Sequence, residues 1–184
     1  MKKRNSAVLA GALILLSSLP IAAQSLDEIL NYREYSPDFA SAGQPTAEQI
    51  ELVRDAGFER VVYIAFSTDR NAIANEDRLV RDLGMDYIHI PVVWDAPTAA
   101  DYESFAAVMT REPDKKTLLH CQVNMRATAF AFLYRVLEQD VPVALAKADM
   151  NTVWEPNPAW QAMIFEVLEA NGVSPDCDAC EWGD

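Results

Sequence analysis

The residues with the clearest chemical potential lie in one short stretch, His120-Cys121-Gln-Val-Asn-Met-Arg126. Thr117 to His120 reads as a buried strand, and an apolar helix is predicted to begin at the end of the stretch, with Arg126 in its first turn. A helix N-terminus presents unpaired backbone N–H groups and the positive end of the helix dipole, and both favour anions. The sequence therefore predicts a thiolate at Cys121 and hence a nucleophile at neutral pH.

The same loop can also hold a tetrahedral oxyanion. Backbone N–H groups at a helix start bind some of its oxygens. The guanidinium of Arg126 can bind two more through parallel hydrogen bonds. Nucleophile and anion site would then share one loop. Besides Cys121 and Arg126, the residues expected to contact the substrate are His120, Gln122, Val123, Asn124, Met125 and Thr128.

At these positions the sequence resembles the cysteine-dependent tyrosine and dual-specificity phosphatases, whose signature is His-Cys, five residues, Arg, then Ser or Thr. Here four residues separate Cys121 from Arg126, and the hydroxyl residue, Thr128, comes second after the arginine. Asn124 stands in place of the usual loop glycine, and Asn is one of the few residues besides Gly that tolerate a left-handed backbone. A bacterial group of phosphatase-like domains, the β-lactamase-hydrolase-like domains, is more closely similar, because a Cys, four residues, Arg loop is usual there.

Two further motifs resemble this bacterial group, Ala42-Gly-Gln-Pro45 and Met150-Asn-Thr-Val-Trp-Glu-Pro156. The resemblance covers about Phe39 to Leu168. It implies a phosphatase-like fold and a cysteine nucleophile, with His120 orienting the loop rather than transferring protons. No metal or other cofactor is expected, because the arginine and the backbone dipoles supply the positive charge.

A second stretch with chemical potential is Val93-Trp-Asp-Ala-Pro-Thr98. An alkoxide or phenoxide leaving phosphorus needs a proton, which a carboxylic acid on a closing loop can supply. Asp95 lies 26 residues before Cys121, at a strand end, as the mobile acid of the resembling phosphatases does. The alternative is that Asp95 and Thr98 only cap the following helix.

The loop Ser67 to Asn71 follows another strand, at the sheet edge where ligands bind in open α/β sheets. Asp69 and Arg70 within it are interpreted as ordinary loop residues in preference to pocket residues. His89 lies inside a predicted strand and is interpreted as a hydrogen-bonded sheet histidine rather than a base or a ligand.

The alternation of strands and helices predicts an α/β fold of three layers: a short, mainly parallel central sheet of four or five strands, flanked by helices. An additional helical cluster is expected in the C-terminal half. The predicted strands are 39–43 at the sheet edge, 60–66, 85–93 and 117–120. The predicted helices are 26–32, 46–57, 72–83, 99–111, 127–137, 143–153 and 157–170.

The N-terminus has the pattern of a secretory signal. Lys2-Lys3-Arg4 precedes an uncharged run from Ala7 to Leu19, and cleavage is expected after Ala23. A retained anchor is the alternative. The chain is thus divided into a signal at 1–23, an N-terminal extension at 24–37, a phosphatase-like domain at 38–172 and an acidic tail at 173–184, with a periplasmic or secreted location.

Charge and cysteine usage limit the partners. The formal charge of −13 becomes −16 once the three basic residues of the signal are removed, so nucleic acid and anionic lipid are not expected as partners. Cys177 and Cys180 are expected to form a local disulfide in an oxidising compartment. A metal or redox site is the alternative, but zinc needs four ligands and no second cysteine pair exists.

Three functions fit these observations. The first is hydrolysis of a phosphomonoester, on a small molecule or a protein such as one carrying phosphotyrosine or phosphoserine, through a cysteinyl-phosphate on Cys121. The second is sulfur transfer by a persulfide on Cys121, because rhodanese-type active loops commonly span the six residues from Cys121 to Arg126. The third is binding of an oxyanion or a phosphorylated ligand without turnover.

Overall fold

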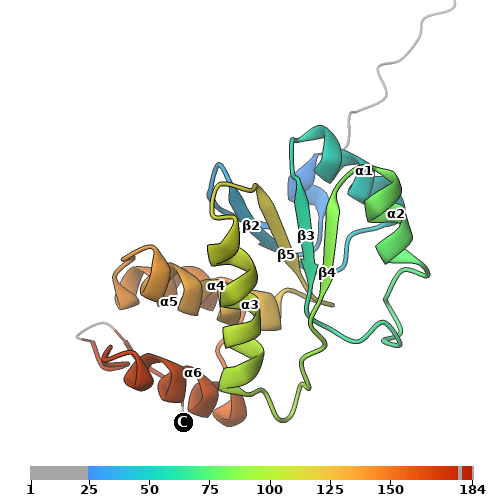
Figure 1. The fold of residues 1–184 in the computed structure, drawn as a ribbon. Coiled ribbons are helices and arrows are strands. Elements are labelled where there is room, and N and C mark those ends of the chain that lie inside the picture. Colours follow the sequence, from blue (N-terminus) through green and yellow to red (C-terminus); the bar gives the residue numbers. More distant parts are fainter. Residues whose placement is uncertain (1–24, 178–179, 184) are drawn as a thin grey trace, which may run out of the picture.

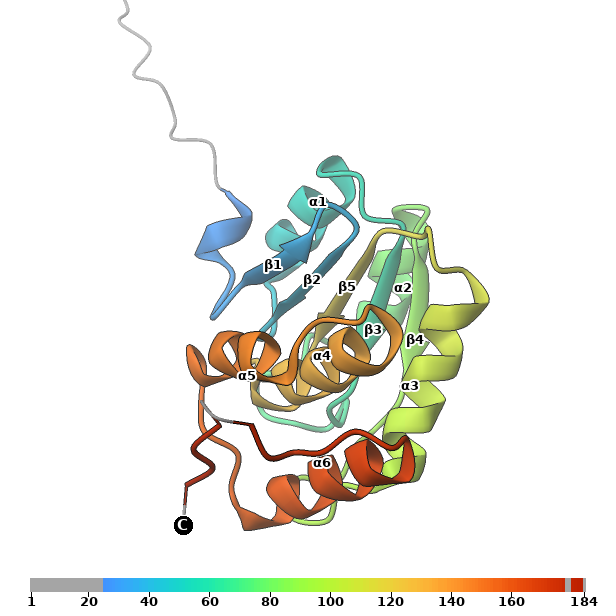
Figure 2. The same cartoon turned by 90° about the vertical axis from the view of Figure 1, so that its left-hand side faces the viewer.

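The computed structural model describes residues 25–177 and 180–183, which form a five-stranded sheet between two layers of helices (Figure 1). The strands are β1 (Arg33–Ser36), β2 (Phe39–Ala42), β3 (Arg60–Tyr63), β4 (Asp86–His89) and β5 (Thr117–His120). Their order across the sheet is β1-β2-β5-β3-β4, as Figure 2 shows, and only β1 runs antiparallel to its neighbour. The predicted three-layer, mainly parallel α/β fold is confirmed.

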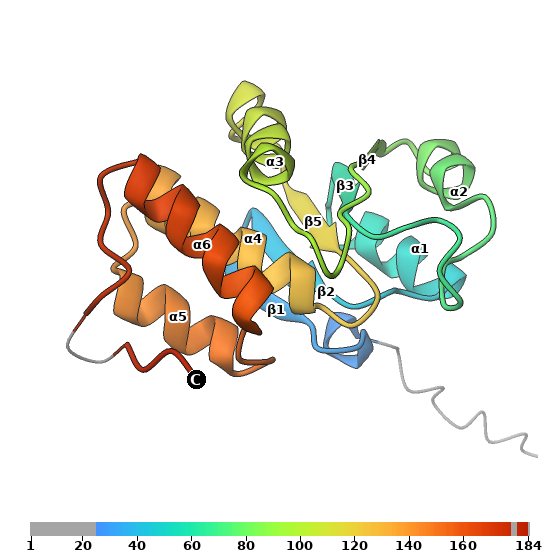
Figure 3. The same ribbon diagram turned by 90° about the horizontal axis from the view of Figure 1, so that it is seen from below.

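The helices divide between the two faces of this sheet. One face is covered by α1 (Ala47–Asp55) and α2 (Glu76–Asp82), and the other by α3 (Ala99–Arg111) and α4 (Met125–Glu138). The expected C-terminal helical cluster consists of α5 (Val143–Asn151) and α6 (Pro158–Ala170), which both contact α4. Seen from below, the sheet runs between the two groups of helices (Figure 3).

Both faces of the central strands are buried, because successive side chains of a strand point to opposite sides. Val61 and Leu118 belong to the core beneath α1 and α2. Val62 and Leu119 belong to the larger core beneath α3 and α4. This is why these strands are continuously apolar in the sequence rather than alternating.

The predicted helix starts are confirmed by side-chain caps. Thr46 and Gln49 form a capping box at α1, and Thr98 and Asp101 form another at α3. Gly57 follows α1 with a φ of 84°, in the left-handed region that glycine adopts without strain.

The prediction that residues 39–43 form an edge strand is wrong. β2 lies inside the sheet, because Arg33–Ser36, within the expected N-terminal extension, pairs antiparallel with it as the true edge. Tyr35 holds this edge, since its ring lies 5.4 Å from that of Phe39 and its hydroxyl is 2.8 Å from Oγ of Ser41. The helix expected over 26–32 is reduced to one 3-10 turn, Leu26–Glu28.

Two elements are shorter than expected around the loop after β3. The strand predicted over 60–66 ends at Tyr63, and the helix predicted from residue 72 begins at Glu76. Asn75, in a left-handed conformation, immediately precedes this helix. The loop at the carboxyl end of β3 is therefore longer than predicted and spans residues 64–75.

The last described residues fold back onto the C-terminal helices. The predicted disulfide between Cys177 and Cys180 is present. Beyond it, the ring of Trp182 makes edge contacts with Phe132 and Phe165. The expected signal lies at residues 1–23, outside the described residues. In the part of the chain that the structure describes, no helix is both long and apolar enough to cross a membrane.

Candidate active site

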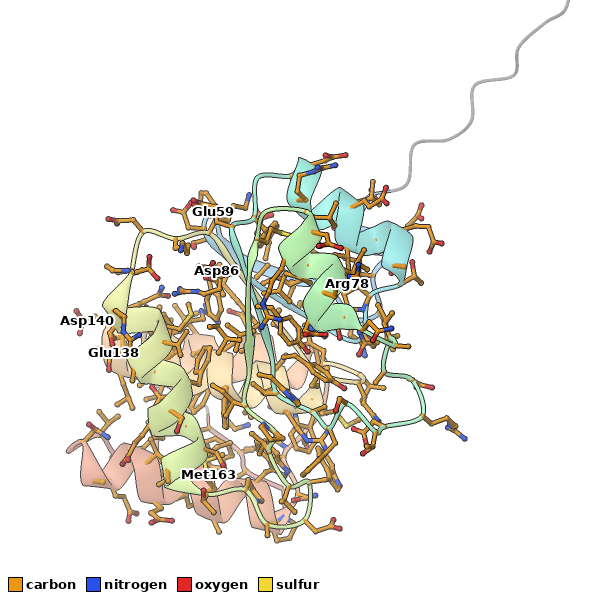
Figure 4. The ribbon with its side chains drawn as sticks, turned by 45° about the vertical axis from the view of Figure 1, so that its right-hand side comes forward. Glu59, Arg78, Asp86, Glu138, Asp140 and Met163 are labelled. Carbon is orange, nitrogen blue, oxygen red and sulfur yellow. A yellow bond between two sulfur atoms is a disulfide. The ribbon has the colours of Figure 1, made fainter. Side chains whose placement is uncertain are left out.

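Cys121 lies directly after the carboxyl end of β5, in the short connection to α4. Its N–H donates to the carbonyl of Ala42 at 3.3 Å, so the start of the loop is held by the neighbouring strand. Figure 4 labels Glu59 and Asp86 at the amino ends of β3 and β4, which is the opposite edge of the parallel strands. The position agrees with the rule that ligands bind at the carboxyl ends of such strands.

A cavity of about 340 Å³ opens at this loop. Cys121 is only 1% exposed yet lines the cavity, so it is recessed within it. The guanidinium of Arg126 lies 5.3 Å from the ring centre of Trp94, and both residues line the same cavity. The full lining is Asp69, Trp94, Cys121, Gln122, Val123, Met125 and Arg126.

The turn into α4 depends on a reciprocal pair of asparagines. Asn124 has a φ of 71°, in the left-handed region, which confirms that it takes the conformation of a loop glycine. Its Nδ2 donates to the carbonyl of Asn31 at 2.6 Å, and Nδ2 of Asn31 donates to the carbonyl of Val123 at 3.0 Å. The N-terminal segment therefore fixes the loop from outside.

The Ala42 to Pro45 motif supports the loop from the other side. The backbone N–H of Gln44 donates to the carbonyl of Gln122 at 3.0 Å. Gly43 is required by close approach, because a Cβ there would lie 3.0 Å from the Leu30 carbonyl oxygen and 3.1 Å from that of Gln122. The motif is therefore part of the scaffold of the cysteine loop.

A buried polar cluster lies behind the loop. Nε2 of His120 is 3.0 Å from Oε1 of Glu76, although their angles are poor for a hydrogen bond. The same carboxylate oxygen accepts a hydrogen bond from Nε2 of Gln44 at 3.2 Å. The ring of His120 also stacks on Tyr63, with centres 4.6 Å apart. This is the kind of contact that orients the residue preceding the cysteine, as the resemblance implied.

The pKa of Tyr63 depends on the charges around this cluster. Burial raises the pKa of its phenol above the ordinary value. The negative charges of Glu76, Asp69 and Cys121 raise this pKa further. The positive charge of Arg126 lowers it.

The Met150 to Pro156 motif supports the start of α4. Nε1 of Trp154 donates to Oγ1 of Thr128 at 3.2 Å, and that hydroxyl donates to the carbonyl of Met125 at 3.0 Å. The Trp154 ring lies 5.2 Å from that of Trp94. Nε1 of Trp160 donates to the carbonyl of Trp94 at 2.9 Å. The fully buried Trp160 is core, as predicted, and it also holds the wall of the cavity.

The structure brings together five of the nine predicted site residues at the cavity: Cys121, Gln122, Val123, Met125 and Arg126. His120, Asn124 and Thr128 are buried beside the loop and position it without lining the cavity. Asp95 is exposed and does not line the cavity either.

Sequence reasoning missed Glu76, whose burial has no sequence signal, and ranked Asp69 as an ordinary loop residue although it lines the cavity. Its loop follows a parallel strand at the edge where ligands bind, but nothing in the sequence singles out Asp69 within that loop. Nε2 of His89 lies 2.7 Å from the carbonyl oxygen of Ala65, which confirms the interpretation as a hydrogen-bonded sheet histidine. Within the described residues, no group of three or more His, Cys, Asp or Glu side chains could hold a metal ion.

A parallel strand ends at a recessed cysteine, and the next helix places an arginine in the same cavity. In a phosphatase-like α/β fold, these features define the class of cysteine-dependent phosphatases. The class is that of a hydrolase, and it was predicted from the sequence.

Comparisons with known proteins agree. A family model described as a DSP-PTPase phosphatase fused to NAD+ kinase matches residues 20–162. The chain is 34% identical in sequence to a candidate phosphatase of the DUF442 group from Shewanella putrefaciens CN-32, whose crystal structure is known. The match covers 79% of this chain and 96% of that one, and the TM-score of the two structures is 0.73. The chain therefore belongs to this family of dual-specificity and tyrosine phosphatase-like domains. None of the curated proteins matches the chain.

More distant solved structures share the fold. PTPMT1 in complex with PI(5)P is 13% identical, over 77% of this chain and 96% of that one, with a TM-score of 0.65. A variant of TpbA from P. aeruginosa in complex with phosphotyrosine is 16% identical, over 79% of this chain and 93% of that one, with a TM-score of 0.57.

Proposed function

We propose that this protein hydrolyses a phosphomonoester through a cysteinyl-phosphate intermediate, in a compartment outside the cytoplasm. The observation that carries the proposal is that Cys121 and Arg126 line one cavity at the start of α4. A thiolate and a guanidinium that line one cavity, next to a helix N-terminus, suit attack on a phosphoryl group.

The chemistry proceeds in two displacements. The Cys121 thiolate attacks phosphorus, an S–P bond forms, and the bond from phosphorus to the ester oxygen breaks. Arg126 and the loop N–H groups stabilise the charge on the phosphoryl oxygens, while a carboxylic acid gives a proton to the departing oxygen. Water then attacks the cysteinyl-phosphate, the carboxylate takes a proton from that water, and phosphate leaves as the thiolate is restored. The sequence predicts Asp95 as this acid.

The substrate proposed is a phosphate-bearing small molecule or protein. Trp94, Val123 and Met125 give the cavity an apolar wall beside the cysteine, which suits an ester with an aromatic or aliphatic leaving group. Two proteins of the same fold are known in complex with phosphotyrosine and with PI(5)P, and both ligands carry a phosphomonoester group.

An extracytoplasmic location is supported by two features of the chain. The disulfide between Cys177 and Cys180 belongs to oxidising compartments. The basic and then apolar start of the sequence, which is the expected signal, would direct the protein there. Fractionation of cells that produce the full chain tests the location, and a protein retained in the cytoplasm with both cysteines reduced would contradict it.

The direct test of the activity is phosphate release from an aryl phosphate. Cys121→Ser should abolish release, because a serine hydroxyl at this site is a far weaker nucleophile than a thiolate. A chelator should leave the wild-type rate unchanged. The double variant Cys177→Ser, Cys180→Ser is the matched control, since it removes the other two thiols and should retain activity. A correctly folded protein that turns over no phosphoester would refute the proposal.

Sulfur transfer is a second candidate, favoured by one observation: only four residues separate Cys121 from Arg126, one fewer than in the phosphatase signature. Thiosulfate would then pass its sulfane sulfur to the Cys121 thiolate and leave as sulfite. Mass spectrometry after thiosulfate treatment separates the two candidates, because only sulfur transfer adds one sulfur atom to Cys121. Oxyanion binding with neither reaction would instead indicate a binding domain.

A further inference from the structure

We infer that the cavity between α3, α4 and α6 is a second ligand site, which binds an aliphatic diamine or polyamine. No described residue lines both this cavity and the one at Cys121, so the two sites are distinct. The inference does not depend on the proposed phosphatase function. It rests on the acidic lining of the cavity and on one buried hydroxyl group without a partner.

The cavity has a volume of about 310 Å³ and is lined by residues of three helices. α3, α4 and α6 contact one another, and Figure 3 shows them side by side. Ala99, Glu103 and Ala106 of α3 follow each other at intervals of three or four residues, so one side of this helix faces the cavity. Small-molecule sites in proteins have volumes of about 300–1,000 Å³, and the cavity is therefore large enough for a small ligand.

Three glutamates from three different helices line the cavity: Glu103 of α3, Glu138 of α4 and Glu166 of α6. Figure 4 labels Glu138 beside α3. All three are exposed, and among the described residues none of them forms an ion pair. The described lining contains no lysine, arginine or histidine. The protein therefore leaves the negative charge at this cavity unbalanced, and a cation is attracted to it.

Two helix ends add to this negative charge. α4 ends at Glu138 and α6 at Ala170, and both residues line the cavity. A helix C-terminus carries partial negative charge and favours cations. The last turn of α6 has no basic residue, and Arg135 in the last turn of α4 is paired with Asp149 at 2.7 Å. The start of α3, whose partial charge is positive, is offset by the Asp101 carboxylate in its capping box.

The independent observation is the hydroxyl group of Tyr102. This residue is only 3% exposed and lines the cavity, and its Oη is buried without a hydrogen-bond partner. Buried polar atoms are nearly always paired, because an unpaired one has lost its hydration without replacement. The Tyr102 ring is fixed by an edge contact with Phe130, with centres 5.7 Å apart. A ligand in the cavity would supply the partner that the protein does not.

The phenol of Tyr102 can accept a hydrogen bond from such a ligand. Burial and the negative charge of Glu138 raise the pKa of this phenol above its ordinary value, so the hydroxyl is neutral at neutral pH. A neutral hydroxyl oxygen has lone pairs that accept from an N–H group.

The other polar groups of the lining indicate which kind of ligand fits. Ionised carboxylates only accept hydrogen bonds. Nδ2 of Asn171 already donates to the carbonyl of Val167 at 2.8 Å, which leaves Oδ1 of Asn171 as an acceptor. An ammonium group brings three N–H donors and a positive charge, so it matches this set of acceptors.

The apolar part of the lining favours an aliphatic cation. Ala99 and Ala106 on α3 and Val167 on α6 line the same cavity as the glutamates, so methylene groups of a ligand would be buried there. Because the glutamates come from different helices, an elongated ligand can reach more than one of them. In the described part of the chain, no three His, Cys, Asp or Glu side chains could hold one metal ion together. A diamine or polyamine, with ammonium groups separated by methylene chains, fits this arrangement.

The test measures binding of spermidine to the purified protein by isothermal titration calorimetry. Putrescine, butylamine and 1,4-butanediol are the comparison ligands, with two, one and no ammonium groups. The variants are Tyr102→Phe, Glu103→Gln, Glu138→Gln and Glu166→Gln. Glu51→Gln is the matched control, because it removes one exposed carboxylate from α1, on the other face of the sheet. The melting temperature without ligand checks that each variant is folded.

Spermidine should bind more tightly than putrescine, and putrescine more tightly than butylamine, while the neutral diol should not bind. Tyr102→Phe should weaken spermidine binding at least about tenfold, because a hydrogen bond to a charged group is lost. Each of the three glutamine variants at the cavity should weaken it about two- to fivefold. Glu51→Gln should leave the affinity unchanged. Without ligand, Tyr102→Phe should keep the melting temperature of the wild type, since its hydroxyl has no partner in the protein.

Three results would overturn the inference. The first is that spermidine does not bind. The second is equal affinity in all variants, which would mean that the polyamine only neutralises the acidic surface. The third is that Mg²⁺ displaces spermidine and is itself bound more weakly by the three cavity variants, which would indicate a metal site. If Tyr102→Phe does not fold, the three glutamine variants compared with Glu51→Gln decide the question.

Discussion

Asn124 allows the most quantitative test of the loop geometry. Its φ of 71° places it in the left-handed region, and its Nδ2 donates to the Asn31 carbonyl at 2.6 Å. Asn124→Gly and Asn124→Ala both lose this hydrogen bond. Only Gly keeps the left-handed backbone without strain.

The expected magnitudes follow from these two contributions. Loss of the hydrogen bond lowers the free energy of unfolding by about 1 kcal/mol in both variants. The alanine at positive φ costs about 1–2 kcal/mol more. The glycine gives the unfolded chain extra entropy, which costs about 0.4–1 kcal/mol. Asn124→Ala should therefore be the less stable of the two by about 0.5–1 kcal/mol.

Urea denaturation measures this difference. A typical m-value is about 1–3 kcal/mol/M, so the midpoint of Asn124→Ala should lie roughly 0.2–1 M below that of Asn124→Gly. Asn71 provides the matched control, because it is an exposed asparagine that is absent from the residues with positive φ. There the order should reverse, with alanine more stable than glycine by about 0.4–1 kcal/mol.

The reasoning about the loop would be refuted if Asn124→Ala were as stable as Asn124→Gly while the Asn71 pair behaved as expected. A second readout is phosphate release from an aryl phosphate. Because Asn124 immediately precedes α4, strain there should displace the N–H groups of the loop. The alanine variant should therefore lose more activity than the glycine variant.

Two other substitutions and the reduction of the disulfide test the packing around the loop and in the C-terminal tail. Glu76→Ala leaves Gln44 and His120 without their shared partner and should lower the free energy of unfolding by about 1–3 kcal/mol, measured by urea denaturation; no change would show that the cluster is not stabilising. Trp160→Ala should cost about 3–5 kcal/mol in the same assay, because a fully buried indole is lost, and a loss below about 1 kcal/mol would contradict the packing. Reduction of the disulfide, which joins cysteines three positions apart, should cost only about 2 kcal/mol, seen as a small fall in melting temperature; a larger collapse would mean that the tail is essential to the fold.

Much of the fold follows from the sequence because its signals are local. Capping residues such as Thr46 and Thr98 mark helix starts, and buried apolar runs mark the parallel strands. β1 was not predicted from the sequence, because Arg33–Ser36 is short and polar and only its pairing with β2 makes it a strand. Sheet order depends on such long-range pairings, which no local pattern contains.

The part of the site that is contiguous in the sequence was also predictable. The strand, cysteine, loop and arginine are adjacent in the sequence, so the placement of Cys121 and Arg126 follows from local structure. Asp69 and Glu76 reach the site from another βα connection, and an aspartate in a loop carries no mark of what it will face. Their burial arises only from tertiary packing.

The indole cluster of Trp94, Trp154 and Trp160 couples the cavity to the C-terminal helices. Trp94 carries the wall beside Arg126, and its backbone is hydrogen-bonded to α6 through the Trp160 indole. A substitution that shifts α6 should therefore change the shape of the cavity at Cys121, although no residue of α6 lines it.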